Sequence, residues 1–212
     1  MPSSSTPYIL GLAGGVGSGK SSAARILSRL GAHVIDFDAL TQTVLDRPDV
    51  RDTLVEWWGP SVLDDRRQVD RAAVAQRIFQ SDADRKRLEA LIHPLVWRTR
   101  EQAQSEAVAH HKDIAVMDAP LLFEAGLDRE CDAVLFIDTD RAIRLSRVGT
   151  NRGWDEAELT RRESAQLPVE QKKARSRFVV ANNAGEGELE VAIRRILDII
   201  RESQRHPPVP TP

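Results

Sequence analysis

The sequence predicts an α/β fold with three layers, in which a five-stranded parallel sheet lies between helices. Two observations predict it. Short apolar runs alternate along the chain with stretches whose apolar residues recur at helical spacing. The runs are apolar nearly throughout, as expected for strands that are buried on both faces of a parallel sheet. The predicted strands cover residues 8–13, 32–35, 114–117, 133–137 and 178–181.

The first strand is separated from the helix after it by a glycine-rich stretch. The helix is predicted over residues 22–30, where the apolar residues have helical spacing. Gly31 follows, and glycine commonly ends a helix. The second strand then leads into Asp36-Phe37-Asp38. The order of strand, glycine-rich stretch and helix is typical of a phosphate-binding unit.

Residues 39–111 contain helical patterns and no convincing strand. A plain crossover between parallel strands needs only about a dozen residues, so this block is too long to be one. It is predicted to be an inserted helical sub-domain. The clearest helical patterns cover residues 50–58, 71–79 and 87–97.

The rest of the chain returns to strands. The third strand ends in Asp118-Ala119-Pro120 and the fourth ends in Asp138. A helix is predicted to begin at Arg141, and residues 147–177 are dense in Arg, Lys and Glu. The fifth strand is followed by an amphipathic helix over residues 187–203.

Length and composition limit the class of protein. The chain has 212 residues, of which 41% are hydrophobic, so it can bury a core of its own. Its net charge of −2 gives no overall positive potential that would attract nucleic acid. No apolar stretch approaches the length of a membrane span. The single cysteine excludes an internal disulfide. We therefore expect a soluble cytoplasmic monomer that binds neither nucleic acid nor membrane. Residues 1–7 and the proline-rich residues 204–212 are expected to be flexible tails.

Residues 14–21 read Gly-Gly-Val-Gly-Ser-Gly-Lys-Ser and match the phosphate-binding P-loop. The glycines let the backbone turn tightly, so that several N–H groups point inward and form a nest for an anion. Lys20 adds a positive charge near the β- and γ-phosphates, and Ser21 offers a hydroxyl to Mg²⁺ at the start of a helix. The motif predicts a nucleoside triphosphate site. Its candidate residues are Gly15, Val16, Gly17, Ser18, Gly19, Lys20, Ser21 and Ser22.

Acidic residues follow two of the other predicted strands. Asp36 and Asp38 follow the second strand and Asp118 follows the third. Phosphoryl transfer needs a group that orients or deprotonates the attacking hydroxyl and an acid in the Mg²⁺ shell. A carboxylate at the carboxyl end of a parallel strand fits either role. The alternative role of each Asp is to cap a helix or to form a turn, and Asp138 is assigned to that alternative.

Taken together, these motifs resemble the dephospho-CoA kinase family. The resemblance covers nearly everything between the tails and has the same order and similar spacing. It rests on the P-loop, Val34-Ile35-Asp36-Phe37-Asp38, Leu91-Ile92-His93-Pro94 and Asp118-Ala119-Pro120-Leu121-Leu122-Phe123-Glu124. Segments 68–79, 166–173 and 182–183 also fit the family.

The resemblance implies an ATP-dependent transfer of a phosphoryl group to the ribose 3′-hydroxyl of dephospho-CoA. The products are CoA and ADP, and the reaction is the last step of CoA synthesis. In this family the acid that matches Asp38 is the suggested general base, and the P-loop with Lys20 binds ATP. The expected cofactor is Mg²⁺, with Ser21 and Asp118 as candidate ligands. Asp36, His93, Asp118 and Pro120 are the candidate substrate-binding residues.

The resemblance also implies a domain organisation. Residues 8–38, 112–146 and 178–203 would form the nucleotide-binding core. Residues 39–111 would form a helical CoA domain, and residues 147–177 a mobile lid. An arginine near Arg147 or Arg152 belongs to the lid and would stabilise the transferred charge, although the spacing between them is one residue longer than usual.

The chain departs from the family pattern at several positions. Gln42 stands where an Arg is usual, which leaves one expected contact to the substrate phosphate or ribose unassigned. Ser176-Arg177 and Ala181 replace an Ala-Asp pair and an Asp near the last strand.

Three rival functions remain. A nucleoside or nucleotide kinase would fit the P-loop but not residues 118–124. A regulatory GTP switch would need an Asn-Lys-x-Asp string to bind guanine, and the sequence lacks one. A nucleotide-binding scaffold without catalytic activity would not need Lys20, Ser21 and a candidate general base together.

Overall fold

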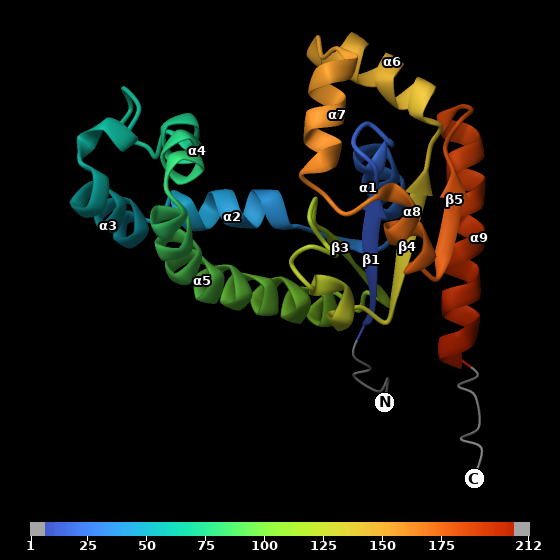
Figure 1. Cartoon of the computed structure of the whole chain (residues 1–212). Coiled ribbons are helices and arrows are strands. Elements are labelled where there is room, and N and C mark those ends of the chain that lie inside the picture. The colour runs from blue at the N-terminus through green and yellow to red at the C-terminus, as the bar shows by residue number, and fades with distance from the viewer. Residues whose placement is uncertain (1–6, 206–212) are drawn as a thin grey trace. The chain divides into compact units, whose positions relative to one another are not determined.

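The computed structural model describes residues 7–205, which form two compact units (Figure 1). The first unit contains residues 7–35 and 106–205, and the second is Asp36–Ser105. The second unit overlaps the insertion predicted over 39–111, but it begins three residues earlier and ends six residues earlier. The functions predicted for the two parts stay predictions.

The first unit is built on the predicted five-stranded parallel sheet, and the α/β fold class is confirmed. The strand order is β2-β3-β1-β4-β5, so β1 is central and pairs with β3 on one side and β4 on the other. Each strand lies within one residue of its predicted bounds at either end. The strands are β1 (Tyr8–Gly14), β2 (His33–Asp36), β3 (Ile114–Asp118), β4 (Ala133–Asp138) and β5 (Phe178–Ala181).

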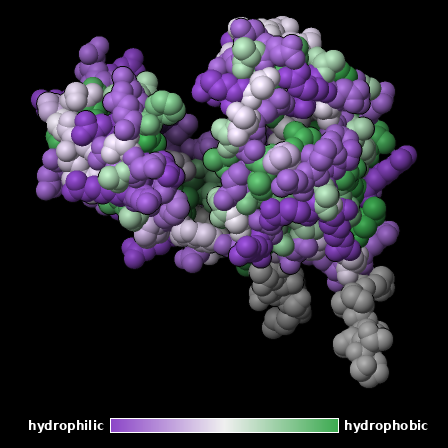
Figure 2. Space-filling view, viewed as in Figure 1, coloured by the Kyte–Doolittle hydropathy of each residue, from purple (hydrophilic) through white to green (hydrophobic). Residues whose placement is uncertain are grey.

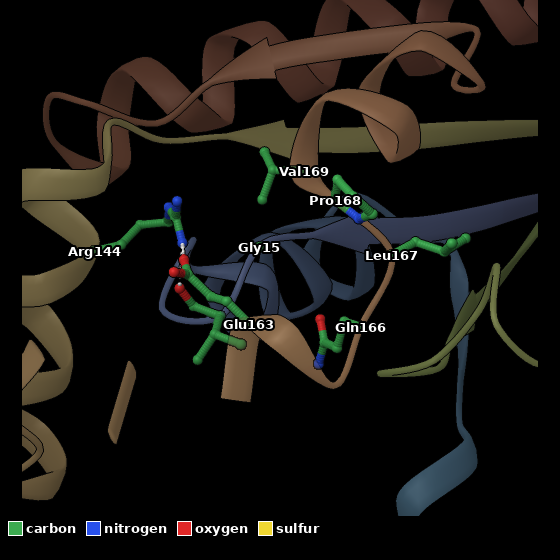
Figure 3. A pocket seen from close by; sticks show the side chains of 8 residues that line it. Gly15, Arg144, Glu163, Gln166, Leu167, Pro168 and Val169 are labelled. Carbon is green, nitrogen blue, oxygen red and sulfur yellow. Dashed lines mark hydrogen bonds and ion pairs between the residues drawn. The ribbon is translucent and has the colours of Figure 1, made fainter. Parts of the chain in front are cut away.

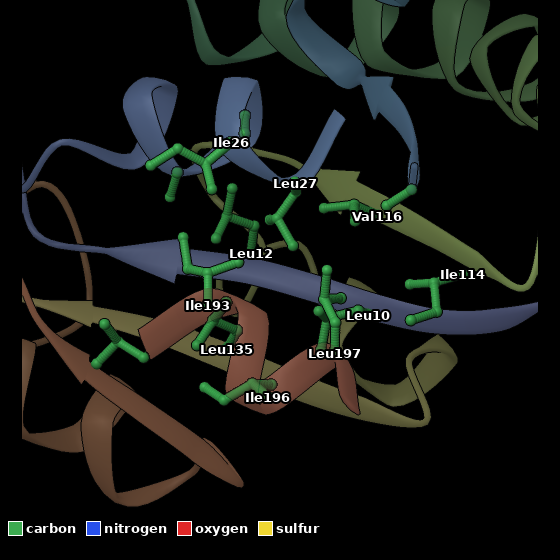
Figure 4. Close-up of a cluster of buried hydrophobic side chains, with 14 of the residues drawn as sticks. Leu10, Leu12, Ile26, Leu27, Ile114, Val116, Leu135, Ile193, Ile196 and Leu197 are labelled. Carbon is green, nitrogen blue, oxygen red and sulfur yellow. The ribbon is translucent and has the colours of Figure 1, made fainter. Parts of the chain in front are cut away.

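One face of the sheet packs against α1 (Lys20–Arg29) and α9 (Glu186–Arg205). Leu10 and Leu12 of β1 are fully buried there, and Figure 4 shows them among side chains of both helices. Burying one such leucine contributes roughly 1.5–3 kcal/mol. α9 reaches Arg205, so the helix includes residues 204 and 205 of the predicted C-terminal tail. Residues 1–6 and 206–212 of the predicted tails lie outside the described residues.

The other face of the sheet is covered by the segment after β3 and by α8 (Val169–Ala174). Successive side chains of a strand point to opposite faces, so Gly11 faces away from α1 and α9. A Cβ atom at Gly11 would lie 2.9 Å from Cys131 Sγ and from a methyl group of Leu122. The segment therefore packs tightly on β1. It contains the short 3-10 helix η2 (Leu127–Glu130).

Two further helices of the first unit, α6 (Arg141–Arg152) and α7 (Glu156–Ser164), follow β4. α6 begins at Arg141 as predicted and ends at Gly153, which has a left-handed φ of 66°. Figure 2 shows hydrophilic side chains over most of the visible face, with smaller hydrophobic areas between them. Among the described residues, no helix is both long and apolar enough to span a bilayer.

The second unit is helical and has its own core. It contains α2 (Phe37–Leu45), α3 (Pro48–Trp58), the 3-10 helix η1 (Pro60–Val62), α4 (Arg71–Gln80) and most of α5 (Asp82–Ala109). Leu54 is fully buried in this core, and Trp57 and Trp58 pack against it. Trp58 Nε1 donates a hydrogen bond to Asp84, so the tryptophans have the packing role that is the ordinary alternative to base stacking. α5 continues through Pro94 without a break.

Candidate active site

The P-loop joins the carboxyl end of β1 to the N-terminus of α1. Gly17 and Gly19 have φ values of 78° and 88°, which side chains other than glycine rarely adopt. A Cβ atom at Gly17 would also lie 2.9 Å from the Val148 side chain. Within the loop, the Ser18 N–H donates to the Gly15 carbonyl at 3.1 Å. Backbone strain and close packing therefore both require the glycines that build the predicted nest.

Lys20, at the start of α1, forms an ion pair with Asp118, at the end of β3. The strand register explains the contact, because Asp118 pairs with Leu12 of β1, just before the loop. The two side chains are 20% and 13% exposed. The structure thus brings together two of the residues that the sequence predicts for the site, a cation suited to phosphate and a carboxylate suited to Mg²⁺.

Arg144 and Arg147 of α6 both reach the loop. Arg144 is 5% exposed, pairs with Glu163 of α7, and donates to the carbonyls of Thr139 at 3.1 Å and Val16 at 3.3 Å. Arg147 donates to the Ser18 carbonyl at 3.4 Å. The loop is therefore held from outside by two guanidinium groups.

Arg152, the other predicted lid arginine, lies at the turn between α6 and α7. Its guanidinium is 4.6 Å from the centre of the Trp154 ring, and Arg162 is 4.0 Å from the same ring. Gly153 ends the helix here, so the residues after it leave the direction of α6. Of the two candidate lid arginines, the structure places Arg147 at the P-loop and Arg152 at this turn.

A cavity of about 180 Å³ lies beside the P-loop. Figure 3 shows Arg144 and Glu163, two of its lining residues, pointing towards each other and joined by an ion pair. Its apolar wall comes from the turn between α7 and α8, and Gly15 forms part of the opposite wall. The lining residues are Gly15, Val16, Arg144, Glu163, Gln166, Leu167, Pro168 and Val169.

Glu124 fixes the turn that lines this cavity. Its Oε1 accepts hydrogen bonds from the Leu167 N–H at 2.7 Å and from Lys172 Nζ at 2.8 Å. The Lys172 side chain is 3% exposed and also donates to Gln166 at 2.9 Å. Burial raises the pKa of the Glu124 carboxyl, but the hydrogen bonds from Lys172 and Leu167 outweigh this effect, so the pKa lies below its ordinary value.

Replacing Glu124 with Gln is expected to lower the free energy of unfolding by about 3–5 kcal/mol near pH 7, because the buried Lys172 ammonium loses its counter-charge. Folding lowers the pKa of Glu124, so its carboxylate stabilises the fold above the ordinary value of 4.5 and loses this effect as pH falls through the lower folded pKa. Chemical unfolding of both proteins across this range should show the difference shrink in acid. A difference that is the same at every pH would contradict this assignment. Glu170→Gln, on the exposed side of α8, is the matched control.

Most of the other predicted site residues are exposed. Asp36 caps α2 by accepting from the Ala39 N–H at 3.0 Å, which is the capping role noted as its alternative. Asp38 is exposed in the first turn of α2, and His93 is exposed on α5. Pro120 is exposed two residues after β3. Ser22 Oγ accepts a hydrogen bond from Arg25 at 3.0 Å.

Sequence reasoning missed Glu163, Thr139 and Asn182 as neighbours of the loop. Thr139 and Asn182 directly follow β4 and β5, so their position at the carboxyl ends of strands was an available signal. Glu163 gave no such signal, because an acid on a charged helix is ordinarily a solvated residue.

Comparison with known proteins agrees with this geometry. A family model described as dephospho-CoA kinase matches residues 8–188. The dephospho-CoA kinase of Deinococcus radiodurans is 38% identical over 200 residues, which cover 92% of this chain and 96% of that protein. The corresponding enzyme of Geobacter sulfurreducens is 38% identical over 189 residues, covering 89% and 96%.

Solved structures show the same fold. The crystal structure of TT1252 from Thermus thermophilus has a TM-score of 0.81 at 31% identity and covers 92% of this chain and 98% of that one. Dephospho-CoA kinase from Campylobacter jejuni has a TM-score of 0.68 at 19% identity, covering 92% and 98%, which supports the fold alone.

A parallel sheet whose central strand runs into a glycine loop, with a lysine in that loop facing an acid on the neighbouring strand, is typical of P-loop proteins that bind nucleoside triphosphates. The comparisons place this chain among the P-loop kinases. The wider pattern of matches identifies which one. The chain belongs to the dephospho-CoA kinase family. It is thus an ATP-dependent kinase that acts on dephospho-CoA in the last step of CoA synthesis.

Proposed function

We propose that the P-loop holds the phosphates of ATP and that Lys20 neutralises the charge that develops during transfer to the 3′-hydroxyl of dephospho-CoA. The observation that carries this proposal is the ion pair between Lys20 and Asp118 at the mouth of the loop. The ion pair keeps the Lys20 ammonium next to the N–H groups of the P-loop. The phosphates of bound ATP would compete with the single Asp118 carboxylate for this ammonium.

Mg²⁺ would be held by Ser21 and Asp118. Among the described residues, no group of three or more His, Cys, Asp or Glu is arranged to hold a metal. Mg²⁺ in kinase sites takes most of its ligands from phosphates and water, so a hydroxyl and one carboxylate are a suitable set of hard oxygen donors. When bound, the ion would neutralise charge between the β- and γ-phosphates.

Asp38 would be the general base that accepts the proton of the attacking hydroxyl. It is exposed in the first turn of α2, close in sequence to the carboxyl end of β2. Asp36 would contribute to substrate binding in addition to capping α2. The cytoplasmic location and the monomeric state are also proposals, and they rest on the composition of the chain.

The second unit would bind dephospho-CoA, with His93 of α5 among its contacts. His93→Ala is expected to raise the KM for dephospho-CoA while the affinity for ATP stays the same, because the two substrates would be held by different units. Initial rates with each substrate varied, together with direct ATP titration, test this division. An unaltered KM for dephospho-CoA and unaltered turnover would return His93 to an ordinary surface role.

The lid would be formed by residues 147–177, which keep water from the γ-phosphate when they close. Arg147→Ala is expected to lower turnover, because its guanidinium lies beside the P-loop and would complete the charge clamp when the lid closes. Arg152→Ala should have the smaller effect, because Arg152 stacks on Trp154. Turnover and ATP affinity measured separately for each variant test this order. Normal turnover of both variants would show that the charge clamp is made from other residues.

A further inference from the structure

Three donors from three different elements converge on one carbonyl of the P-loop, that of Ser18. Asn182 Nδ2 donates to it at 2.8 Å, Thr139 Oγ1 at 3.0 Å and Arg147 Nη1 at 3.4 Å. Thr139 follows β4, Asn182 follows β5, and Arg147 belongs to α6. A carbonyl oxygen has two lone pairs, so this oxygen is saturated with donors.

These contacts are buried. Ser18 is 1% exposed, and Thr139 and Asn182 are each 6% exposed. Asn182 is itself held in place, since its N–H donates to the Asp138 carbonyl at 2.7 Å and its carbonyl accepts from Arg147 at 3.0 Å. Thr139 and Asn182 are therefore fixed by the ends of β4 and β5 rather than by the loop.

The close approach also explains one glycine. A Cβ atom at Gly19 would collide with the side-chain amide of Asn182. Gly19 has a φ of 88°, so a side chain there is excluded both by backbone strain and by the Asn182 amide. The loop and Asn182 thus fit together at this peptide.

Holding the Ser18 carbonyl has a direct consequence for the next N–H group. In a trans peptide the C=O and the N–H point in opposite directions. Fixing the Ser18 carbonyl outward therefore aims the Gly19 N–H inward, towards the nest where a phosphate would lie. Among residues 7–205, the Gly19 N–H donates no hydrogen bond, so it is free to bind an anion.

We propose that Asn182 and Thr139 are positioning residues for ATP, which orient the Ser18–Gly19 peptide so that its N–H binds a phosphate. The inference rests on the proposed binding of ATP phosphates by the P-loop. Because the phosphate would be held by this N–H both before and during transfer, the two residues act on ATP affinity rather than on the chemical step.

The test compares Asn182→Ala, Thr139→Val and Thr139→Ser with the wild-type chain, by titration of Mg-ATP and by steady-state rates with dephospho-CoA. Asn182→Ala and Thr139→Val are each expected to raise the Kd and KM for ATP about 2- to 10-fold, with kcat at saturating ATP nearly unchanged. Thr139→Ser keeps the hydroxyl and should restore wild-type affinity. Asn183→Ala is the matched control, because Asn183 is exposed and accepts from the Asp140 N–H at 2.9 Å.

Other outcomes would overturn the proposal. Unaltered ATP affinity in Asn182→Ala and Thr139→Val would do so, as would an equal loss in Asn183→Ala. A fall in kcat together with the unfolding temperature, not restored by Thr139→Ser, would mean that the residues only stabilise the fold. Lys20→Ala, measured in parallel, separates this inference from the function on which it rests. If that variant keeps normal turnover, the proposed P-loop function fails, whereas a defective Lys20→Ala beside an unaffected Asn182→Ala contradicts only the positioning role.

Discussion

Lys20→Ala is expected to lower turnover by about 10²–10³ while the protein stays folded, because the removed charge acts on developing phosphate charge rather than on the core. Lys20 is 20% exposed and its partner Asp118 is 13% exposed, so the change leaves a carboxylate that is not fully buried, rather than a cavity in the core. Turnover at saturating dephospho-CoA, together with an unfolding curve, measures both parts of this expectation.

Lys173→Ala is a matched control for this variant. Lys173 pairs with Asp138 at the end of β4, at 2.6 Å, as Lys20 pairs with Asp118 at the end of β3. Both changes therefore remove a lysine from an acid at a strand end, but only Lys20 lies in the P-loop. Equal losses of turnover would show that the position in the loop is not what matters, and a folded Lys20→Ala protein with near-normal turnover would refute the assignment of the loop.

Asp38→Asn is expected to lower turnover by roughly 10²–10⁴ with ATP binding nearly unchanged, because the amide keeps the size and polarity of the carboxylate but cannot accept the hydroxyl proton. The rate of the chemical step and the affinity for Mg-ATP should be measured separately. Asp46→Asn, at the other end of α2, makes the same chemical change beside Arg71 and serves as the control.

The opposite pattern would identify a different role for Asp38. If the affinity for ATP or Mg²⁺ collapses while the chemical step survives, Asp38 belongs to the metal shell and Asp36 is the next candidate for the base. Asp36→Asn can be tested without disturbing α2, since Asn caps a helix about as well as Asp.

The sheet and the P-loop could be predicted from the sequence because both are encoded locally. Strands buried on both faces read as continuous apolar runs, and all five were located within a residue of their ends. The loop needs glycines at fixed spacing, and Gly17 and Gly19 have the positive φ values that this spacing anticipates. The Asp118 prediction also depended only on a strand end, which the sheet brings next to the loop.

The residues that brace the loop could not be found in this way. Arg144 and Glu163 are one pair among many charged residues of α6 and α7, and only the packing of the two helices buries Arg144. Glu124 and Lys172 are separated by 47 residues in sequence, so no local pattern links them. Spacing along a helix likewise cannot show that the Arg152 guanidinium lies over the Trp154 ring. These contacts depend on tertiary structure.

The most direct measurement is ADP release in a coupled assay with ATP as donor, comparing dephospho-CoA with a panel of nucleosides, nucleotides and small alcohols as acceptors. Residues 8–188 match the dephospho-CoA kinase family, and dephospho-CoA should therefore be phosphorylated with a kcat/KM far above that of every other acceptor. The product should be CoA with its new phosphate on the 3′-oxygen of the ribose. Preferential turnover of a nucleoside or nucleotide, with dephospho-CoA inert, would contradict the assignment.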